Sequence, residues 1–137
     1  MKIKKVMGIA KDTLNFILEA SKSTHPNEFV GLLQTEKEVI ANVILLPGTV
    51  SSNTSAVIRL EMLPMDLYSV GSVHSHPTQN KTPSIADLRM FSKKGDYHII
   101  ACYPYDEESW ACYDRSGNRR DIKVLDIKFD ENEELLW

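Results

Sequence analysis

The pattern of apolar and polar positions predicts short strands alternating with amphipathic helices. Residues 11–22 place Leu14, Ile17, Leu18 and Ser21 at the three- and four-residue spacing of a helix with one buried face. Apolar runs of four to eight residues, bounded by turn-forming residues, are typical of strands. Such runs occur at residues 3–6, 28–33, 39–46, 56–60, 97–102, 109–113 and 122–129. The pattern therefore predicts an α/β fold, a mixed β-sheet with helices packed on it.

Turn-forming residues separate these segments. Small and polar residues or Gly and Pro cluster at residues 23–27, 35–38, 47–55 and 115–118, where we expect turns or loops. Pro64 is suited to the first position of a short helix that leads into the next strand. The chain contains neither an internal repeat nor a low-complexity linker. We therefore expect a single domain over residues 1–137.

Composition and charge exclude some classes of partner. The chain of 137 residues is 42% hydrophobic and 26% charged, which is ordinary for a globular domain with one core. Its net charge of −3 argues against nucleic acid or an anionic membrane as the main partner, because both require clustered positive charge. The apolar run from Val6 to Ala10 is too short for a signal peptide or a membrane span. We expect a cytoplasmic protein.

Two histidines stand at the end of a predicted strand. Residues 67–73 are largely apolar and predict a buried strand that continues through His74 and His76. Side chains two residues apart point to the same face of a strand, so the two imidazoles lie side by side. Pro77 ends the strand directly after them. Taken alone, the two histidines are at least as typical of a hydrogen-bonded pair or a solvated strand end as of a metal site.

Two further polar residues follow at helical spacing. Thr82 is suited to cap a helix whose first residue is Pro83, which would leave Ser84 and Asp87 free on one helix face. The alternative is that Ser84 and Asp87 themselves form a capping box, in which each side chain satisfies the other's backbone N–H. The spacing alone favours the capping box.

The histidines and the carboxylate lie within 14 residues of one another, and this conjunction favours a metal site. Two imidazoles and one carboxylate leave a tetrahedral zinc ion with one open position for water. An open position is typical of catalytic zinc sites, whereas structural sites are closed by four protein ligands. The zinc deaminases are disfavoured, because their His-x-Glu and Pro-Cys-x-x-Cys motifs are missing.

At these residues the chain resembles the JAMM (MPN+) metalloproteases. Seven residues separate His76 from Ser84, and two separate Ser84 from Asp87, as in that family. An upstream glutamate in the family lies in a His-Pro-x-Glu-x-x-Gly-Leu-Leu context, which here corresponds to Glu28. The resemblance extends from about residue 15 to residue 113. Without it, Glu28 would be taken for a solvated residue at the entrance of a strand.

The resemblance implies a fold, a cofactor and an activity. The fold is the cytidine-deaminase-like MPN architecture, with one zinc ion per chain held by His74, His76 and Asp87. Glu28 would act as general base and then acid, and Ser84 would stabilise the oxyanion. The implied reaction is hydrolysis of isopeptide bonds after the C-terminal glycine of ubiquitin-like small modifier proteins on lysine.

Some alternatives stay open at this point. The compact, archaeal-type chain could process the C-terminus of a sulfur-carrier protein by cutting a peptide bond. It could also be a non-catalytic MPN-type scaffold, although its ligand set is complete. The oligomeric state is open as well.

Cys102 and Cys112 occupy the two strands of a predicted hairpin. A disulfide forms only if the strand register pairs them, and a cytosolic protein normally keeps its thiols reduced. Their spacing does not indicate a metal site. His98, alone on its strand, is expected to be structural.

Overall fold

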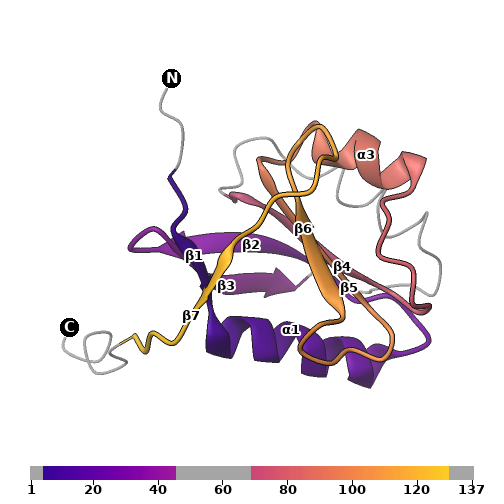
Figure 1. Cartoon of the computed structure of the whole chain (residues 1–137), viewed down its shortest axis with the longest axis horizontal. Helices are drawn as coiled ribbons and strands as arrows, with labels where there is room; N and C mark the ends of the chain where they lie inside the picture. Colours follow the sequence, from indigo (N-terminus) through magenta and orange to yellow (C-terminus); the bar gives the residue numbers. More distant parts are fainter. Residues whose placement is uncertain (1–4, 46–68, 130–137) are drawn as a thin grey trace.

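The strands form one curled sheet in the computed structural model, which describes residues 5–45 and 69–129 (Figure 1). Along the chain the described elements are β1 (Gly8–Ala10), α1 (Lys11–Thr24), β2 (Val30–Glu36), β3 (Val39–Leu45), β4 (Gly71–His76), α3 (Ile85–Phe91), β5 (Tyr97–Cys102), β6 (Trp110–Tyr113) and β7 (Lys123–Leu125). The strand order is β6-β5-β4-β2-β3-β1-β7. The predictions for residues 47–55, for the strand at 56–60 and for the helix from Pro64 lie outside the described residues.

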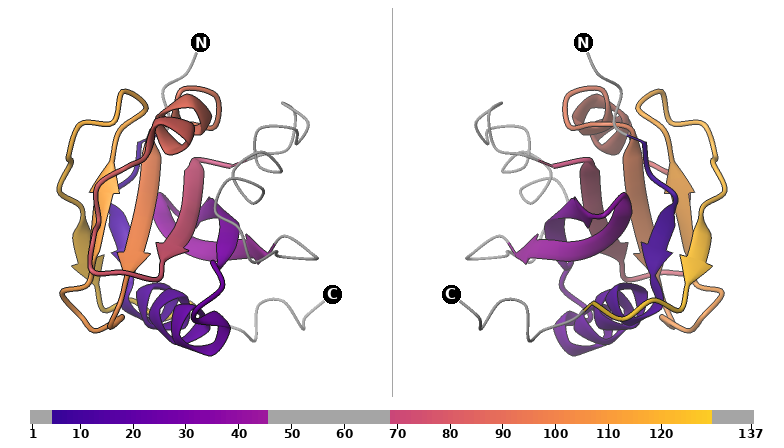
Figure 2. Two further views of the ribbon diagram at one scale, coloured as in Figure 1. Left: turned by 90° about the vertical axis from the view of Figure 1, so that its right-hand side faces the viewer. Right: turned by 90° about the vertical axis from the view of Figure 1, so that its left-hand side faces the viewer.

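The sheet is mixed, as the sequence pattern predicts. Strand β1 is parallel to β3 and β7, and β4 is parallel to β5. The pairs β2–β3, β2–β4 and β5–β6 are antiparallel. The sheet curls, so β6 and β7, at opposite ends of the strand order, lie on the same side of the molecule (Figure 2).

Helices α1 and α3 pack on opposite faces of the sheet. Helix α1 buries Leu14, Ile17 and Leu18 in a core with Val73 and Ile99, which confirms its predicted apolar face. Helix α3 buries Met90 and Phe91 in a second, smaller core formed by alternate residues of the same strands. That second core includes Val30, Leu32, Ile100 and Ala111. The two cores follow the two-residue alternation of side chains along a strand. Among the described residues, no helix is long and apolar enough to cross a membrane.

The first strand begins later than the pattern predicts. Residues 5–7 are not in a strand, and pairing starts at Gly8, which lies between β3 and β7. A Cβ atom at Gly8 would lie 2.5 Å from the carbonyl oxygen of Lys123, so only glycine permits this approach of β7. The prediction for residues 5 and 6 was therefore wrong, because pairing with β3 and β7 begins only at Gly8. The last strand is also shorter than predicted.

The hairpin β5–β6 forms as predicted, but its register separates the two cysteines. Cys112 lies opposite Ile99, and the backbone N–H of Cys102 donates to the carbonyl of Ser109. Both thiols are free and buried. Burial raises the pKa of the Cys112 thiol to about 11, so it stays protonated and unreactive at neutral pH.

His98 has the structural role that its isolated position predicts. Its imidazole stacks on Phe91 of α3, with ring centroids 4.2 Å apart. The carbonyl of Gly95 lies 2.8 Å from Nε2 and can only accept, so Nε2 carries the proton. Nδ1 then accepts from the hydroxyl of Ser72 at 2.7 Å. His98 thus joins β4, β5 and α3 through a neutral ring.

We expect this buried ring to make folding sensitive to acid. Burial lowers the pKa of His98 to about 4, whereas the unfolded value is near 6.5. Between these values the unfolded chain binds more protons, so the stability contributed by neutral His98 is complete above pH 6.5 and is lost as the pH falls toward 4. The full loss is of the order of 3 kcal/mol. Urea unfolding of metal-free wild type and His98→Gln, from pH 7.5 to 4.5, measures it. Equal pH slopes in the two proteins would show that His98 does not titrate in this way.

Candidate metal centre

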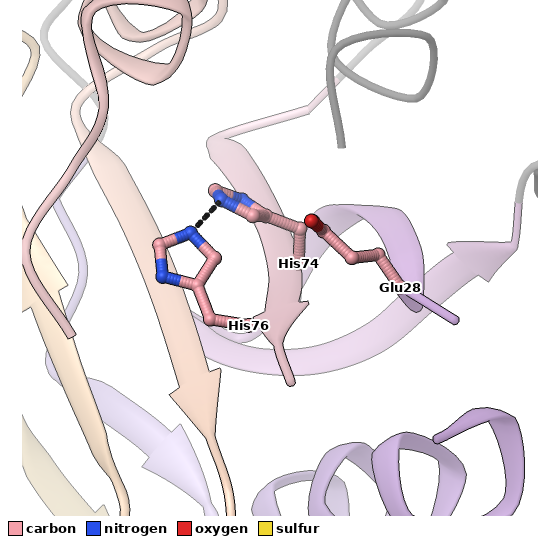
Figure 3. Close-up of side chains that lie close together, drawn as sticks. All are labelled: Glu28, His74 and His76. Atoms are coloured by element: carbon pink, nitrogen blue, oxygen red, sulfur yellow. Dashed lines mark hydrogen bonds between the residues drawn. The ribbon is translucent and has the colours of Figure 1, made fainter. Parts of the chain in front are cut away.

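The sheet brings Glu28, His74 and His76 together on the face that α3 covers (Figure 3). Glu28 precedes β2 and shares its strand face with Val30, which lies opposite His74 in the β2–β4 ladder. One ligand atom from each of the three side chains lies within 4.8 Å of the others. All three are buried, and Glu28 is only 4% exposed. The glutamate is therefore not the solvated residue that its local sequence suggests.

Two hydrogen bonds at Phe29 hold the backbone next to Glu28 against β4. The backbone N–H of Phe29 donates to Oγ of Ser75 at 2.8 Å, and the N–H of Ser75 donates to the carbonyl of Phe29 at 2.9 Å. Three residues before Glu28, Nδ1 of His25 lies 2.8 Å from the hydroxyl of the buried Tyr105. The sequence pattern identified neither contact, because both join segments that are distant along the chain.

Asp87 reaches the two imidazoles from the first turn of α3. Its Oδ1 lies 3.1 Å from Nε2 of His74, and its Oδ2 lies 3.3 Å from Nε2 of His76. The two Nε2 atoms are themselves 3.2 Å apart. A tetrahedral zinc ion with bonds of about 2.0 Å requires neighbouring donor atoms to lie about 3.3 Å apart. The three separations are close to this value, and the two oxygens of Asp87 each face one imidazole.

The helix cap differs from the expectation. Ser84, not Thr82, is the N-cap of α3, and the helix begins at Ile85, not at Pro83. Oγ of Ser84 accepts from the backbone N–H of Asp87 at 3.0 Å, and Oδ2 of Asp87 accepts from the N–H of Ser84 at 2.8 Å. The capping box still leaves Asp87 able to contact the imidazoles, since a carboxylate has about four lone-pair sites.

The charges of the centre are coupled. Burial raises the pKa of Glu28 to about 7, and the Asp87 carboxylate adds to this rise while His76 opposes it. Burial acts in the same direction on Asp87, but its contacts with His74 and His76 outweigh burial and hold its pKa well below the usual range. The pKa of His76 is raised, because its contacts with Asp87 and Asn80 outweigh the opposite effect of burial. Without a metal, the raised pKa values of Glu28 and His76 favour the protonated forms of these two groups.

The unpaired polar atoms fit a metal ion. Among the described residues, three buried side-chain atoms lack a hydrogen-bond partner: Glu28 Oε1, Asp87 Oδ1 and His74 Nδ1. Two of them are carboxylate oxygens beside the imidazoles, where an unpaired buried oxygen costs free energy unless a cation or water satisfies it. Imidazole nitrogens with carboxylate oxygens are a donor set that zinc binds. The site therefore fits a single zinc ion.

Comparison with known proteins decides the family. The profile of prokaryotic homologs of the JAB domain matches residues 10–113. The chain belongs to this family. A probable metalloprotease of Haloferax volcanii is 44% identical over 140 residues, which cover 95% of this chain and 86% of the relative. The resemblance to compact JAMM metalloproteases is thereby confirmed, as is the hydrolase class.

Two solved structures support the same conclusion for this JAB-domain protein. One, described as a metalloprotease-like zinc site in the proteasome and signalosome, is 40% identical, with a TM-score of 0.72 over 88% of this chain and 99% of the other. The other is a JAB1/MPN-domain protein of Archaeoglobus fulgidus, 42% identical, with a TM-score of 0.72 over 88% of this chain and 98% of the other. The MPN fold is therefore confirmed.

We expect one zinc ion per chain in the wild type and none in His76→Ala, because that change removes one donor and leaves Asp87 with a single imidazole. Glu28→Gln should keep the metal, since it leaves the imidazoles of His74 and His76 and the carboxylate of Asp87 unchanged. Zinc content after reconstitution and removal of free metal, measured by atomic emission, tests this. Loss of zinc from Glu28→Gln would show instead that Glu28 is a ligand.

Proposed function

We propose that this protein is a zinc-dependent peptidase that cleaves isopeptide or peptide bonds after the C-terminal glycine of ubiquitin-like small modifier proteins. The observation that supports it best is the buried carboxylate of Glu28 beside two imidazoles that share Asp87. Its partners would be these modifiers and their lysine conjugates.

His74, His76 and Asp87 would hold the zinc ion through Nε2, Nε2 and the carboxylate. A bound zinc ion supplies a nucleophilic hydroxide near neutral pH, by lowering the pKa of its water from about 16 to about 7, and polarises a carbonyl. Asp87 is fixed for this task, because the cap at Ser84 orients its carboxylate from the other side. His76 is fixed in turn, because its Nδ1–H donates to the carbonyl of Asn80 at 2.8 Å and leaves Nε2 free to bind.

Glu28 would move the proton. Its Oε1 is buried without a hydrogen-bond partner, so this oxygen is free to accept a proton from a water molecule. In the metal-free centre burial raises the pKa of this carboxyl group to about 7, and a buried carboxyl group can take a proton and release it again, as a general base that then serves as acid must do. The proton would pass from Glu28 to the leaving amine of the lysine side chain.

Ser84 would stabilise the oxyanion. In the helix cap its Oγ acts as an acceptor, so its own hydroxyl proton is still available to donate. Removing one such donor typically costs about 10² to 10³ in rate.

The modifier class is suggested by the family and by the geometry of an extended tail. JAMM metalloproteases act on the glycine C-termini of ubiquitin-like modifiers, and two glycines present no side chains to a narrow groove. An extended tail can add to a strand edge through backbone hydrogen bonds.

A fluorogenic Gly-Gly-lysine isopeptide conjugate of a small archaeal modifier tests the proposal. We expect turnover by the zinc-loaded wild type and none by Glu28→Gln. A linear fusion to the same C-terminus, assayed in parallel, distinguishes isopeptide from peptide cleavage, and activity on the linear fusion alone would favour carrier processing. If the zinc-loaded wild type cleaves neither substrate, a scaffold role is favoured.

The role of Ser84 can be separated from its capping. Ser84→Ala should lose about 10² to 10³ in kcat and also about 1 kcal/mol of stability, because alanine is a poor N-cap. Ser84→Gly should show the same fall in kcat but lose only a few tenths of a kcal/mol of stability. Ser84→Thr should retain both kcat and stability. Steady-state kinetics and thermal unfolding of the three variants measure these effects. If kcat follows stability across the series, the hydroxyl acts only as a cap.

A further inference from the structure

The loop between β4 and α3 provides a hydrogen-bond acceptor for one histidine of the metal centre. Its residue Asn80 accepts the Nδ1–H of His76 through its backbone carbonyl. A carbonyl can only accept, so this bond fixes the tautomer in which Nε2 keeps its lone pair. The orientation of His76 therefore depends on where this loop holds the Asn80 carbonyl.

One buried hydroxyl holds the loop at the next residue. Tyr113 of β6 is 6% exposed, and its hydroxyl donates to the carbonyl of Lys81 at 2.7 Å. Lys81 also donates an exposed hydrogen bond from its Nζ to the carbonyl of Glu108 at 3.3 Å. A short bond from a buried side chain is worth more than an exposed one, because water does not compete for the acceptor.

The ring of Tyr113 contacts the other segment that carries a donor. It lies 6.2 Å, centroid to centroid, from Phe91 in a stacked arrangement, and Phe91 ends the helix that bears Asp87. Tyr113 thus contacts the loop through its hydroxyl and α3 through its ring. A phenylalanine at this position would keep the second contact and lose only the first.

We propose that Tyr113 is a positioning residue of the metal centre, which holds the 80–81 backbone so that Asn80 orients His76 for metal binding. The inference rests on the proposed zinc binding at His74, His76 and Asp87. Loss of the partner that orients a ligand histidine typically weakens metal binding about 10- to 100-fold. Tyr113 acts through Lys81, the residue after the direct partner Asn80, so we expect a smaller effect. The zinc Kd should rise about 3- to 10-fold in Tyr113→Phe.

Tyr97→Phe is a matched control. Tyr97 lies on the neighbouring strand β5, is 7% exposed, and its hydroxyl accepts from Nη2 of Arg120 at 3.2 Å. This change also removes one hydroxyl hydrogen bond from a mostly buried tyrosine, but it does not affect the loop. Both variants should lose some stability without metal, and only Tyr113→Phe should lose zinc affinity.

The experiment measures the zinc Kd of wild type, Tyr113→Phe and Tyr97→Phe by competition with a chromophoric chelator at pH 7. The difference in Tm between zinc-loaded and zinc-free protein should also shrink in Tyr113→Phe alone. In metal-free protein, NMR should show faster solvent exchange of the His76 Nδ1 proton in that variant.

An unchanged Kd in Tyr113→Phe, or an equal rise in Tyr97→Phe, would overturn the inference while leaving the proposed function intact. A wild type that binds no zinc would instead overturn the proposed function, and with it this role. The two failures are therefore distinguishable in one set of titrations.

Discussion

The structure depends on one electrostatic constraint, which is the burial of two carboxylates, Glu28 and Asp87, beside two imidazoles. A buried charge is costly unless it is paired, and the two carboxylates also repel one another. The imidazoles lower the pKa of Asp87, but each carboxylate keeps one unpaired oxygen, and the pKa of Glu28 rises to about 7. A divalent cation bound by Asp87 and the imidazoles would offset the negative charge of both carboxylates. Burying these carboxylates without a cation costs free energy, and binding a metal ion or a proton removes part of that cost.

The fold meets this cost by fixing the donors from independent elements. The β2–β4 ladder pairs Val30, two residues after Glu28, with His74, and the Ser75 hydroxyl accepts from the backbone N–H of Phe29 at the same edge. Helix α3 delivers Asp87 from the opposite direction, and its cap orients the carboxylate. Because paired strands and a capped helix carry the donors, these side chains lose little conformational entropy when a metal binds. Such preorganisation is what makes a charged group effective in binding and catalysis.

Local periodicity predicted the elements that carry the site, but not the contacts that fix it. The alternation of His74 and His76 and the amphipathic spacing of α1 follow directly from the sequence, because both are properties of a single element. The spacing of Ser84 and Asp87 gave two interpretations, and the structure shows the capping box together with the contacts to both imidazoles. Glu28 needed the resemblance to a family, since its burial depends on strands paired across some 45 residues of chain. The bonds of Tyr105 to His25 and of Tyr113 to Lys81 join distant segments through hydroxyls that no periodic pattern marks.

The hairpin β5–β6 contacts both the strand that carries the two histidines and the loop that follows His76. Strand β5 pairs with β4 in parallel, and Ile100 and Cys102 lie beside His74 and His76 along that ladder. Gly71 at the start of β4 permits this pairing, since a Cβ atom there would lie 1.5 Å from the carbonyl oxygen of Tyr97. The hairpin supplies no donor atom, yet its backbone N–H at Tyr103 and its Tyr113 hydroxyl bond the loop that follows His76 at both ends. A change in the hairpin can thus act on the metal centre without touching any of the residues that would bind the metal, because the loop transmits its position to the imidazole of His76.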